Sequence, residues 1–447
     1  MSRAVSRGLG IADVPIAVYP GVIPTDSEAV LEQKVREHLA PAVIASLTER
    51  AFAAKKIETA EPVPHEIVHS GDLESVQEFF SARGWTDGLP IIPPTRQRVQ
   101  QALRFTSRDP DEVIGVLAPE FRESTVWNVA VNGVMAGCRP EYFPVLLAIA
   151  DALADPQFRI QDAGSTPAWE PLVVISGPLV KELEFNFGTG VMRVGRQANS
   201  SIGRFVRMYF RNMAGLRIPP SDSDQGAIGY SFNVALAEDD DAVTSIGWPS
   251  YREDKGFARE DSIVTVRSVV TISAPIYSGG STAAEHLATI SEIFGQAIGP
   301  WFYLGLVFGA WHPLLVMNPS IARTIAADDA DKDAVRRYLS ENVKTAATSL
   351  ERYAPQVGHT DFTIEQYKQA GRLPSVSLES DGPEQLIRTI PDPANLDLVV
   401  AGSPSRNQSR AYVQNHNQGV PTSRKVVLPP NWDELLEEQR DLKKGRE

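Results

Sequence analysis

The chain has 447 residues and a net charge of −13 at pH 7. Hydrophobic residues make up 43% of it and charged residues 22%, which is the composition of a globular protein with a substantial core. The acidic balance argues against nucleic acid as the main partner, because phosphate binding needs a basic face. A single cysteine excludes an internal disulfide and no secretory signal is evident, so we expect a cytoplasmic protein.

The first 60 residues are expected to form a partial unit ahead of the main body. Residues 14–21 have the pattern of a short strand. Apolar residues at helical spacing, from Val30 to Val43, predict a helix or helix pair over residues 27–54. Residues 61–71, which contain Pro62 and Pro64, are predicted to be a linker.

The linker contains His65 and His69 at the HExxH spacing, which in zinc proteases places two ligands on one face of a helix. Pro64 and Gly71 leave room for barely two helical turns, and the chemistry needs a third ligand. We therefore expect no metal at these histidines. No other motif indicates a cofactor, and the cofactor stays unknown.

A constrained loop is predicted between two helices. Asp72 is the expected N-cap of a helix over residues 73–82, and Thr95 that of a helix over residues 96–105. The intervening loop carries two Gly/Pro turns around Asp87. A carboxylate held by so rigid a backbone could be catalytic or could accept hydrogen bonds from turn N–H groups, and both interpretations stay open.

The only cysteine, Cys138, lies at a helix junction. A helix is expected to close on Gly137, and Pro140 suits the first turn of the next helix. Cys138 would then lie near a helix N-terminus beside Arg139, where the dipole and the cation favour a thiolate. The alternative is an inert buried cysteine, because free cysteine is among the most buried residue types.

Polar residues on both sides of Cys138 are the other candidates in this stretch. Glu141 is a candidate for moving protons, together with Asp87, and Asn132 is a candidate for binding substrate.

A second polar centre follows a buried strand predicted at residues 171–175. The glycine-rich residues 188–203 lead into a helix over residues 204–213, and a plausible carboxylate or phosphate site would combine helix N–H groups with arginines. The alternative is that the arginines form structural ion pairs. The candidate N-caps are Asn199, Ser200 and Ser201, and the candidate anion ligands are Arg193, Arg196, Arg204 and Arg207.

The second half mixes strands and helices. Residues 262–274 alternate as a half-buried strand, Thr282 precedes a helix running to residue 294, and helices are expected over residues 320–328 and 331–352. A last strand is predicted at residues 396–401 and a charged surface helix after residue 431. Glu238 stands out in an acidic turn.

The longest stretch without acidic or basic residues, 293–322, is long enough to cross a bilayer. Glycines, prolines, Gln296 and His312 interrupt it, and no lysine or arginine cluster flanks it. We expect two buried strands there, over residues 301–308 and 314–317, and no membrane span.

These patterns predict an α/β or α+β fold with mixed sheets and packed helices. The main body would cover residues 72–430, possibly as subdomains near 72–260 and 261–430, with a charged tail at 431–447.

Three motifs resemble a bacterial family that is encoded with, or fused to, the UGSC family of (seleno)proteins: GWTDGLPIIPPT (84–95), NGVMAGCRPEYFPVLLA (132–148) and ANSSIGRFVRMYFRNMAG (198–215). Residues 14–48 resemble the end of a UGSC domain. The resemblance covers roughly residues 12–345, and its first two motifs are specific. It implies thiol or selenol chemistry, an oligomer, and a separate UGSC-type or CGSC-type chain as partner, because this chain lacks the Sec/Cys-Gly-Ser-Cys motif.

One segment departs from the family pattern. Residues 319–322 read Pro-Ser-Ile-Ala where relatives carry Pro-Glu-His-Ala, so an acid and a histidine are missing here.

Three functions stay open. The first is an enzyme subunit doing thiol-linked redox or carbon–heteroatom chemistry on a small anionic substrate, with Cys138 as nucleophile or thiol partner. The second is a hydratase or lyase that uses only carboxylates. The third is a non-catalytic subunit that binds a UGSC-type chain.

Overall fold

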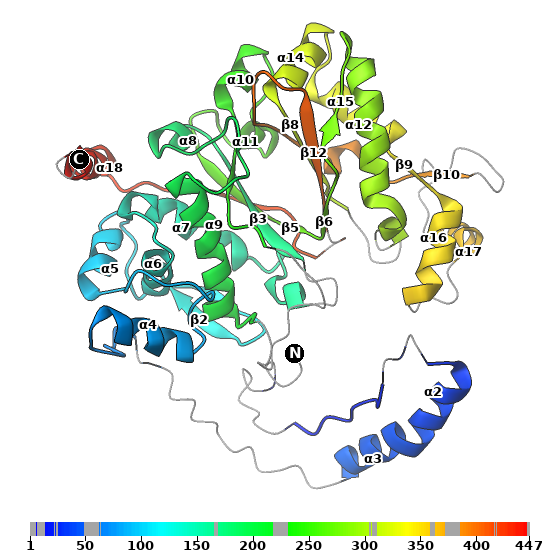
Figure 1. Cartoon of the computed structure of the whole chain (residues 1–447), viewed down its shortest axis with the longest axis horizontal. Coiled ribbons are helices and arrows are strands. Elements are labelled where there is room, and N and C mark those ends of the chain that lie inside the picture. Colours follow the sequence, from blue (N-terminus) through cyan, green and yellow to red (C-terminus); the bar gives the residue numbers. More distant parts are fainter. Residues whose placement is uncertain are drawn as a thin grey trace.

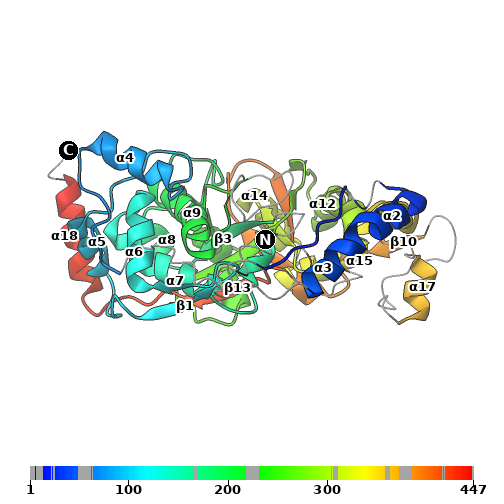
Figure 2. The ribbon, with the colours of Figure 1, turned by 90° about the horizontal axis from the view of Figure 1, so that it is seen from below.

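The computed structural model is a mixed α/β protein in which helices pack on two larger sheets (Figure 1), which confirms the expected fold class. It describes residues 6, 14–21, 23, 26–48, 62, 64–164, 169–217, 231–303, 305, 311–357, 363–371, 385–414, 416 and 418–444. The body is elongated: helices α4 to α7 and α18 lie at one end, and α12, α15 and α17 at the other (Figure 2).

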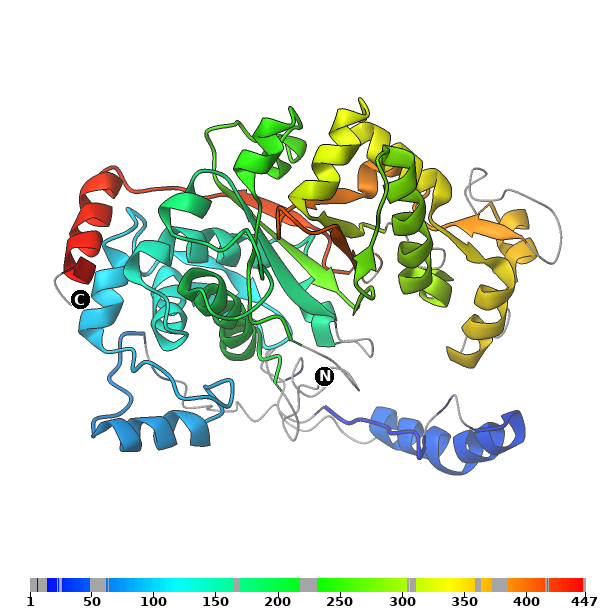
Figure 3. The same cartoon turned by 45° about the horizontal axis from the view of Figure 1, so that its top comes forward.

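The N-terminal segment is a helix that lies apart from the body (Figures 1 and 3). It runs through α2 (Glu28–Lys34), the π-helical turn η2 (Val35–Leu39) and α3 (Ala40–Thr48), and none of its residues is buried. The expected strand at residues 14–21 is wrong: these residues form no ladder, because none of the described strands pairs with them.

Helices and one hairpin form the first end of the body. The elements are α4 (Leu73–Ala82), α5 (Arg96–Leu103), the antiparallel hairpin β1 (Val113–Leu117) and β2 (Arg122–Thr125), α6 (Val126–Met135), the 3-10 helix η3 (Pro140–Tyr142), α7 (Phe143–Leu153) and the 3-10 helix η4 (Ile160–Gly164). Asp72 caps α4 and Thr95 caps α5, as expected. Helix α5 ends two residues earlier than residue 105.

The first larger sheet has the order β13-β5-β3-β4, with strands β3 (Glu170–Ser176), β4 (Leu236–Ala237), β5 (Ile263–Val269) and β13 (Thr422–Lys425). Strand β5 is buried on both faces, so the prediction of a half-buried strand was wrong. One face of β5 packs in the same hydrophobic core as helix α7. The other face packs against the second sheet, where Ile263 of β5 and Leu314 of the second sheet belong to one core cluster.

The second larger sheet has the order β11-β8-β12-β6, and β7 also pairs with β12. Its strands are β6 (Thr271–Ile272), β7 (Ile276–Tyr277), β8 (Leu314–Met317), β11 (Asp397–Val400) and β12 (Gln408–Val413). A small ribbon joins β9 (Lys344–Ala346) to β10 (Leu386–Arg388). Because β13 pairs with β5 in the first sheet, the C-terminal region contributes to both sheets.

The remaining helices cover the sheets and the two ends. They are α8 (Leu179–Glu182), α9 (Gln197–Tyr209), η5 (Phe210–Ala214), α10 (Asp240–Ser245), α11 (Tyr251–Asp254), α12 (Ala283–Ile298), η6 (Gly299–Phe302), α14 (Pro319–Ala327), α15 (Lys332–Asn342), α16 (Ala347–Tyr353), η7 (Ala354–Val357), α17 (Ile364–Gln369), η9 (Pro393–Asn395) and α18 (Trp432–Lys444). The helix expected after Thr282 forms as α12, with Thr282 as its N-cap, and it runs to Ile298 instead of residue 294. Helix α18 buries Trp432 and Leu435 against the body.

Three expectations for the second half were wrong. Residues 301–302 belong to the 3-10 helix η6, because Pro300 starts a helical turn; most of residues 303–308 lie outside the described part. Strand β9 interrupts the helix expected over residues 331–352. Two strands, β12 and β13, follow the strand expected to be last.

The described residues contain no helix that is long and apolar enough to span a membrane.

Candidate functional site

The sequence around Cys138 folds as a tight junction between α6 and α7. Thr125 and Asn128 form a capping box that starts α6. Gly137 ends it with a φ of 83°, a left-handed conformation that favours glycine. The Cys138 N–H then donates to the Gly133 carbonyl at 3.0 Å, and Pro140 opens η3. The chain therefore holds Cys138 in a fixed bend between two packed helices.

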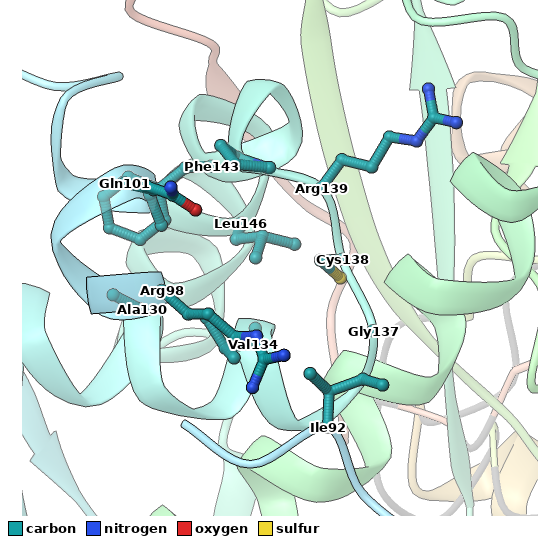
Figure 4. A pocket seen from close by; sticks show the side chains of 13 residues that line it. Ile92, Arg98, Gln101, Ala130, Val134, Gly137, Cys138, Arg139, Phe143 and Leu146 are labelled. Carbon is teal, nitrogen blue, oxygen red and sulfur yellow. The ribbon is translucent and has the colours of Figure 1, made fainter. Parts of the chain in front are cut away.

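A cavity of about 210 Å³ lies beside this bend, between α5, α6 and α7 (Figure 4). Its buried wall is apolar and includes Val134, Phe143 and Leu146. Arg98 and Gln101 lie at its exposed rim. Cys138 lines the cavity and is half-buried. An apolar cavity with a few polar groups at its rim is the usual form of a small-molecule site.

The raised pKa of Cys138 favours a protonated thiol at neutral pH, rather than the thiolate that was one of the two interpretations left open by the sequence. Burial raises the pKa of Cys138 to about 12, although a hydrogen bond with Ser201 and the charge of Arg204 both act to lower it. Helix η3 has only three residues. The Nε–H of Arg139 donates a hydrogen bond to Oε1 of Gln197 at 2.8 Å. The cost of desolvating the thiolate therefore outweighs the stabilisation of the thiolate by a nearby cation and by the N-terminus of the short helix.

Asp87 is connected to the surroundings of Cys138 through its ion-pair partner Arg204, whose charge acts on the thiol. Arg204 donates from Nε and Nη2 to the two carboxylate oxygens of Asp87, both at 2.8 Å, and also to the Pro90 carbonyl at 2.8 Å. Burial acts to raise the pKa of Asp87, but the hydrogen bonds and charge of Arg204 outweigh it and the pKa is lowered. The structure thus brings together Asp87, Arg204, Ser201 and Cys138, with Asp87 ionised and already paired.

Glu141 is buried but does not line the cavity. Burial raises its pKa, against the nearby charge of Arg139, whose Nη1 lies 3.5 Å from Oε1. Its Oε2 has no hydrogen-bond partner among the described residues. Asn132 also faces elsewhere, and its Oδ1 accepts a hydrogen bond from Asn212 at 2.8 Å.

The glycine-rich segment does not supply the expected caps. Helix α9 begins at Gln197, and Arg196 is its N-cap, so Asn199, Ser200 and Ser201 lie inside the helix and their prediction as N-caps was wrong. Asn199 instead fixes the chain by bonding Asn186 and the Ala235 carbonyl. Ser200 accepts from the Gly195 N–H.

The arginines of this region divide into two groups. Arg204 and Arg207 form ion pairs with Asp87 and Glu170, which favours the structural interpretation of these two residues. Arg193 and Arg196 are exposed and form no ion pair with a described carboxylate. They lie outside the lining of the Cys138 cavity.

The two linker histidines make separate contacts. His65 bonds Asp111 at 2.6 Å and stacks on Trp127, whereas His69 bonds Ser75 at 2.7 Å and stacks on Phe79. The segment is not helical, so the HExxH spacing does not place them on one helix face. The described residues contain no group of three or more potential metal ligands.

The sequence interpretation missed the rim residues of the cavity. Arg98, Gln101 and Ala102 recur at the i, i+3, i+4 spacing of one helix face, and all three line the cavity. That spacing was the available signal. The predictions concentrated on the motifs around Cys138 and overlooked the neighbouring helix that completes the wall.

A second buried polar cluster joins the two larger sheets. Asp397 accepts hydrogen bonds from Lys255 (2.6 Å), Arg267 (2.8 Å) and Tyr251 (3.0 Å). Glu238, singled out in the sequence, is fully buried and accepts from Ser176 at 2.6 Å. Apart from the buried Nε of Arg267, which has no hydrogen-bond partner among the described residues, these groups satisfy one another between the sheets. The cluster therefore has a structural explanation.

No known protein-family model matches the chain, and no curated protein matches it. The relationship to the UGSC-associated family therefore stays a prediction that rests on the motifs.

Proposed function

We propose that this chain is the substrate-binding subunit of a thiol-linked enzyme system related to the UGSC proteins. A small anionic substrate binds in the Cys138 cavity, and the chemistry is redox or carbon–heteroatom chemistry at a thiol. The observation that carries this proposal is that the only thiol of the chain lines an apolar cavity with a cation at its rim.

The protonated state of Cys138 supports a division of labour between two chains. A thiol whose pKa is near 12 is a weak nucleophile at neutral pH. The reactive thiol or selenol would therefore come from a partner chain with the Sec/Cys-Gly-Ser-Cys motif, and Cys138 would act as its thiol partner. We expect both chains in the reducing cytoplasm, where free thiols persist.

The carboxylate-only lyase receives less support. Asp87 has both oxygens bound to Arg204, and Glu141 does not line the cavity. A general acid or base must come within hydrogen-bond reach of the substrate, and neither carboxylate does so in this arrangement.

One observation favours the non-catalytic subunit as a second candidate. The N-terminal helix buries no residue, and Ile44 and Leu47 are 60% and 80% exposed. Apolar residues that gather on one exposed helix are typical of a docking surface for another protein. The partner chain would bind this helix whether or not the cavity takes part in catalysis.

Reconstitution tests both candidates. The chain is mixed with a purified UGSC-type chain, small carboxylates and dithiothreitol; the complex is followed by sedimentation and the products by mass spectrometry. We expect a stable complex and a product that requires both chains. Cys138→Ala should abolish the product and leave the complex intact.

Matched surface variants assign the docking surface. Ile44→Asp with Leu47→Asp should abolish the complex, whereas Val427→Asp, at a position of the body that is 70% exposed, should not. A complex whose product is unaffected by Cys138→Ala would contradict a thiol role for this residue. A complex without any product would favour the non-catalytic subunit, and no complex would contradict both candidates.

A further inference from the structure

We infer that the Cys138 cavity binds a compact monocarboxylate with an apolar body, and that Arg98 is the residue that holds its carboxylate. This inference rests on the proposed function, because it names the class of substrate for the same site. It differs from the sequence prediction, which assigned the anion to Arg204, Arg207 and helix N–H groups.

The size of the cavity limits the body of the ligand. A protein cavity of about 150 Å³ lined by Leu, Ile and Phe binds benzene. The present cavity, at about 210 Å³, therefore has room for a benzene-sized body and one carboxylate. Its buried wall, which includes Ala130, Val134, Phe143 and Leu146, presents no charged side chain to that body.

Arg98 is the cation best placed to bind the carboxylate. The only hydrogen bond of its side chain to a described residue runs from Nη1 to the Pro93 carbonyl at 3.1 Å, and the side chain forms no ion pair with a described carboxylate. Figure 4 shows its guanidinium among the lining side chains, near Ile92 and Val134. The planar guanidinium offers Nε and Nη2 as a fork that fits a carboxylate.

The other cations near the cavity are already engaged. Arg139 donates to Gln197 and faces Glu141, and in Figure 4 its side chain extends away from the other lining residues. Arg204 holds Asp87. One available cation suits a single negative charge, and the net charge of −13 opposes multivalent anions such as phosphate.

The protonation state of Cys138 is compatible with a monocarboxylate ligand in this cavity. A thiolate would repel a carboxylate bound nearby, whereas a protonated thiol behaves as a small apolar group. Because burial raises the pKa of Cys138 to about 12, the thiol completes the apolar wall at neutral pH.

Calorimetry with matched probes tests the inference on the full chain. Benzoate should bind, and benzamide, which has the same shape without the charge, should bind at least about tenfold more weakly. Acetate, which lacks the body, and inorganic phosphate should not bind measurably. Arg98→Gln should weaken benzoate about ten- to a hundredfold and leave benzamide unchanged.

Arg96→Gln is the matched control, because Arg96 lies on the same helix and bonds the His65 carbonyl outside the cavity. It should leave benzoate affinity unchanged, and the circular dichroism of both variants should match that of the parent chain. Equal binding of benzoate and benzamide, or equal losses in both variants, would overturn the role of Arg98.

The outcomes separate this inference from the proposed function. No benzoate binding, with thiol-dependent product still formed in the reconstituted system, would overturn the ligand class alone. Arg98-dependent benzoate binding, without any product from the two chains, would overturn the proposed function and leave the ligand class standing.

Discussion

At the scale of single residues, Cys138 shows how burial can outweigh neighbouring charge. The sequence placed a cysteine next to an arginine and before a proline, which favours a thiolate. In the folded chain Arg139 bonds Gln197 and the thiol is desolvated, so the pKa rises to about 12. Sequence proximity singled out a residue that lines a cavity in the folded chain. It could not supply the burial that decides its protonation.

The pH dependence of alkylation tests the protonation state directly, because the chain has one cysteine. The rate of labelling by N-ethylmaleimide should rise about tenfold per pH unit and should not level off below pH 10. The lower thiolate fraction outweighs the greater nucleophilicity of a thiolate with a high pKa. At pH 7 we expect labelling about a hundredfold slower than in urea.

The urea-unfolded chain is the control, and its rate should level off near pH 8.5. A folded chain that levels off at the same pH would contradict a raised pKa. The same shift has a consequence for stability: a folded-state pKa above the unfolded value stabilises the protein below about pH 8.5, and this contribution is lost as the pH rises toward 12.

At the scale of elements, helix α9 and the turn η5 that follows it connect the loop of residues 84–95 to the body. Arg204 holds Asp87 with two hydrogen bonds, and Arg211 donates to the Gly84 carbonyl at 2.7 Å. The sequence left open whether Arg204 and Arg207 bind an anion or pair within the chain, and both pair within it.

Asp87→Asn should lower the free energy of unfolding by about 1–3 kcal/mol at pH 7, because it leaves a mostly buried guanidinium without its charged partner. The exposed pair Arg104–Glu438 is the control: its side chains are 48% and 44% exposed, against 19% and 18% for Arg204 and Asp87. Glu438→Gln should cost less than about 1 kcal/mol. Urea denaturation measures both.

The difference in unfolding free energy between the parent and Asp87→Asn chains should decrease as the pH falls. The pKa of Asp87 is lowered in the folded state, so its stabilisation is present above the unfolded value of about 3.9 and is lost as the pH falls through the folded value. Parent and Asp87→Asn chains should therefore differ at pH 7 and converge in acid, once the pH is below the lowered pKa of Asp87. A difference that persists there would mean that Asp87 acts through packing.

Local sequence signals predicted the starts of two helices correctly. They could not predict which strands pair with partners far along the chain. Asp72 and Thr95 cap helices through hydrogen bonds made within three residues, so the sequence alone identifies them. Strand β9 forms only because β10 lies beside it, and β12 only because β8 does. Such strands depend on partners far along the chain, which a periodicity pattern cannot locate.

At the scale of the whole molecule, helices α5, α6 and α7, which line the candidate site, lie at one end of the body, away from the N-terminal helix (Figure 3). Mixed sheets and packed helices could be predicted from composition and pattern. The cavity could not, because it forms where α5, α6 and α7 meet, and their packing decides which side chains line it.

Hydrogen–deuterium exchange across the whole chain, with and without benzoate, tests most directly the central claim that the Cys138 cavity is the ligand site. Benzoate should slow exchange in residues 96–103 and 126–146 and leave α12, in the other half of the body, unchanged. Slower exchange confined to residues 188–203, around Arg193 and Arg196, would contradict the claim and restore the glycine-rich segment as the anion site.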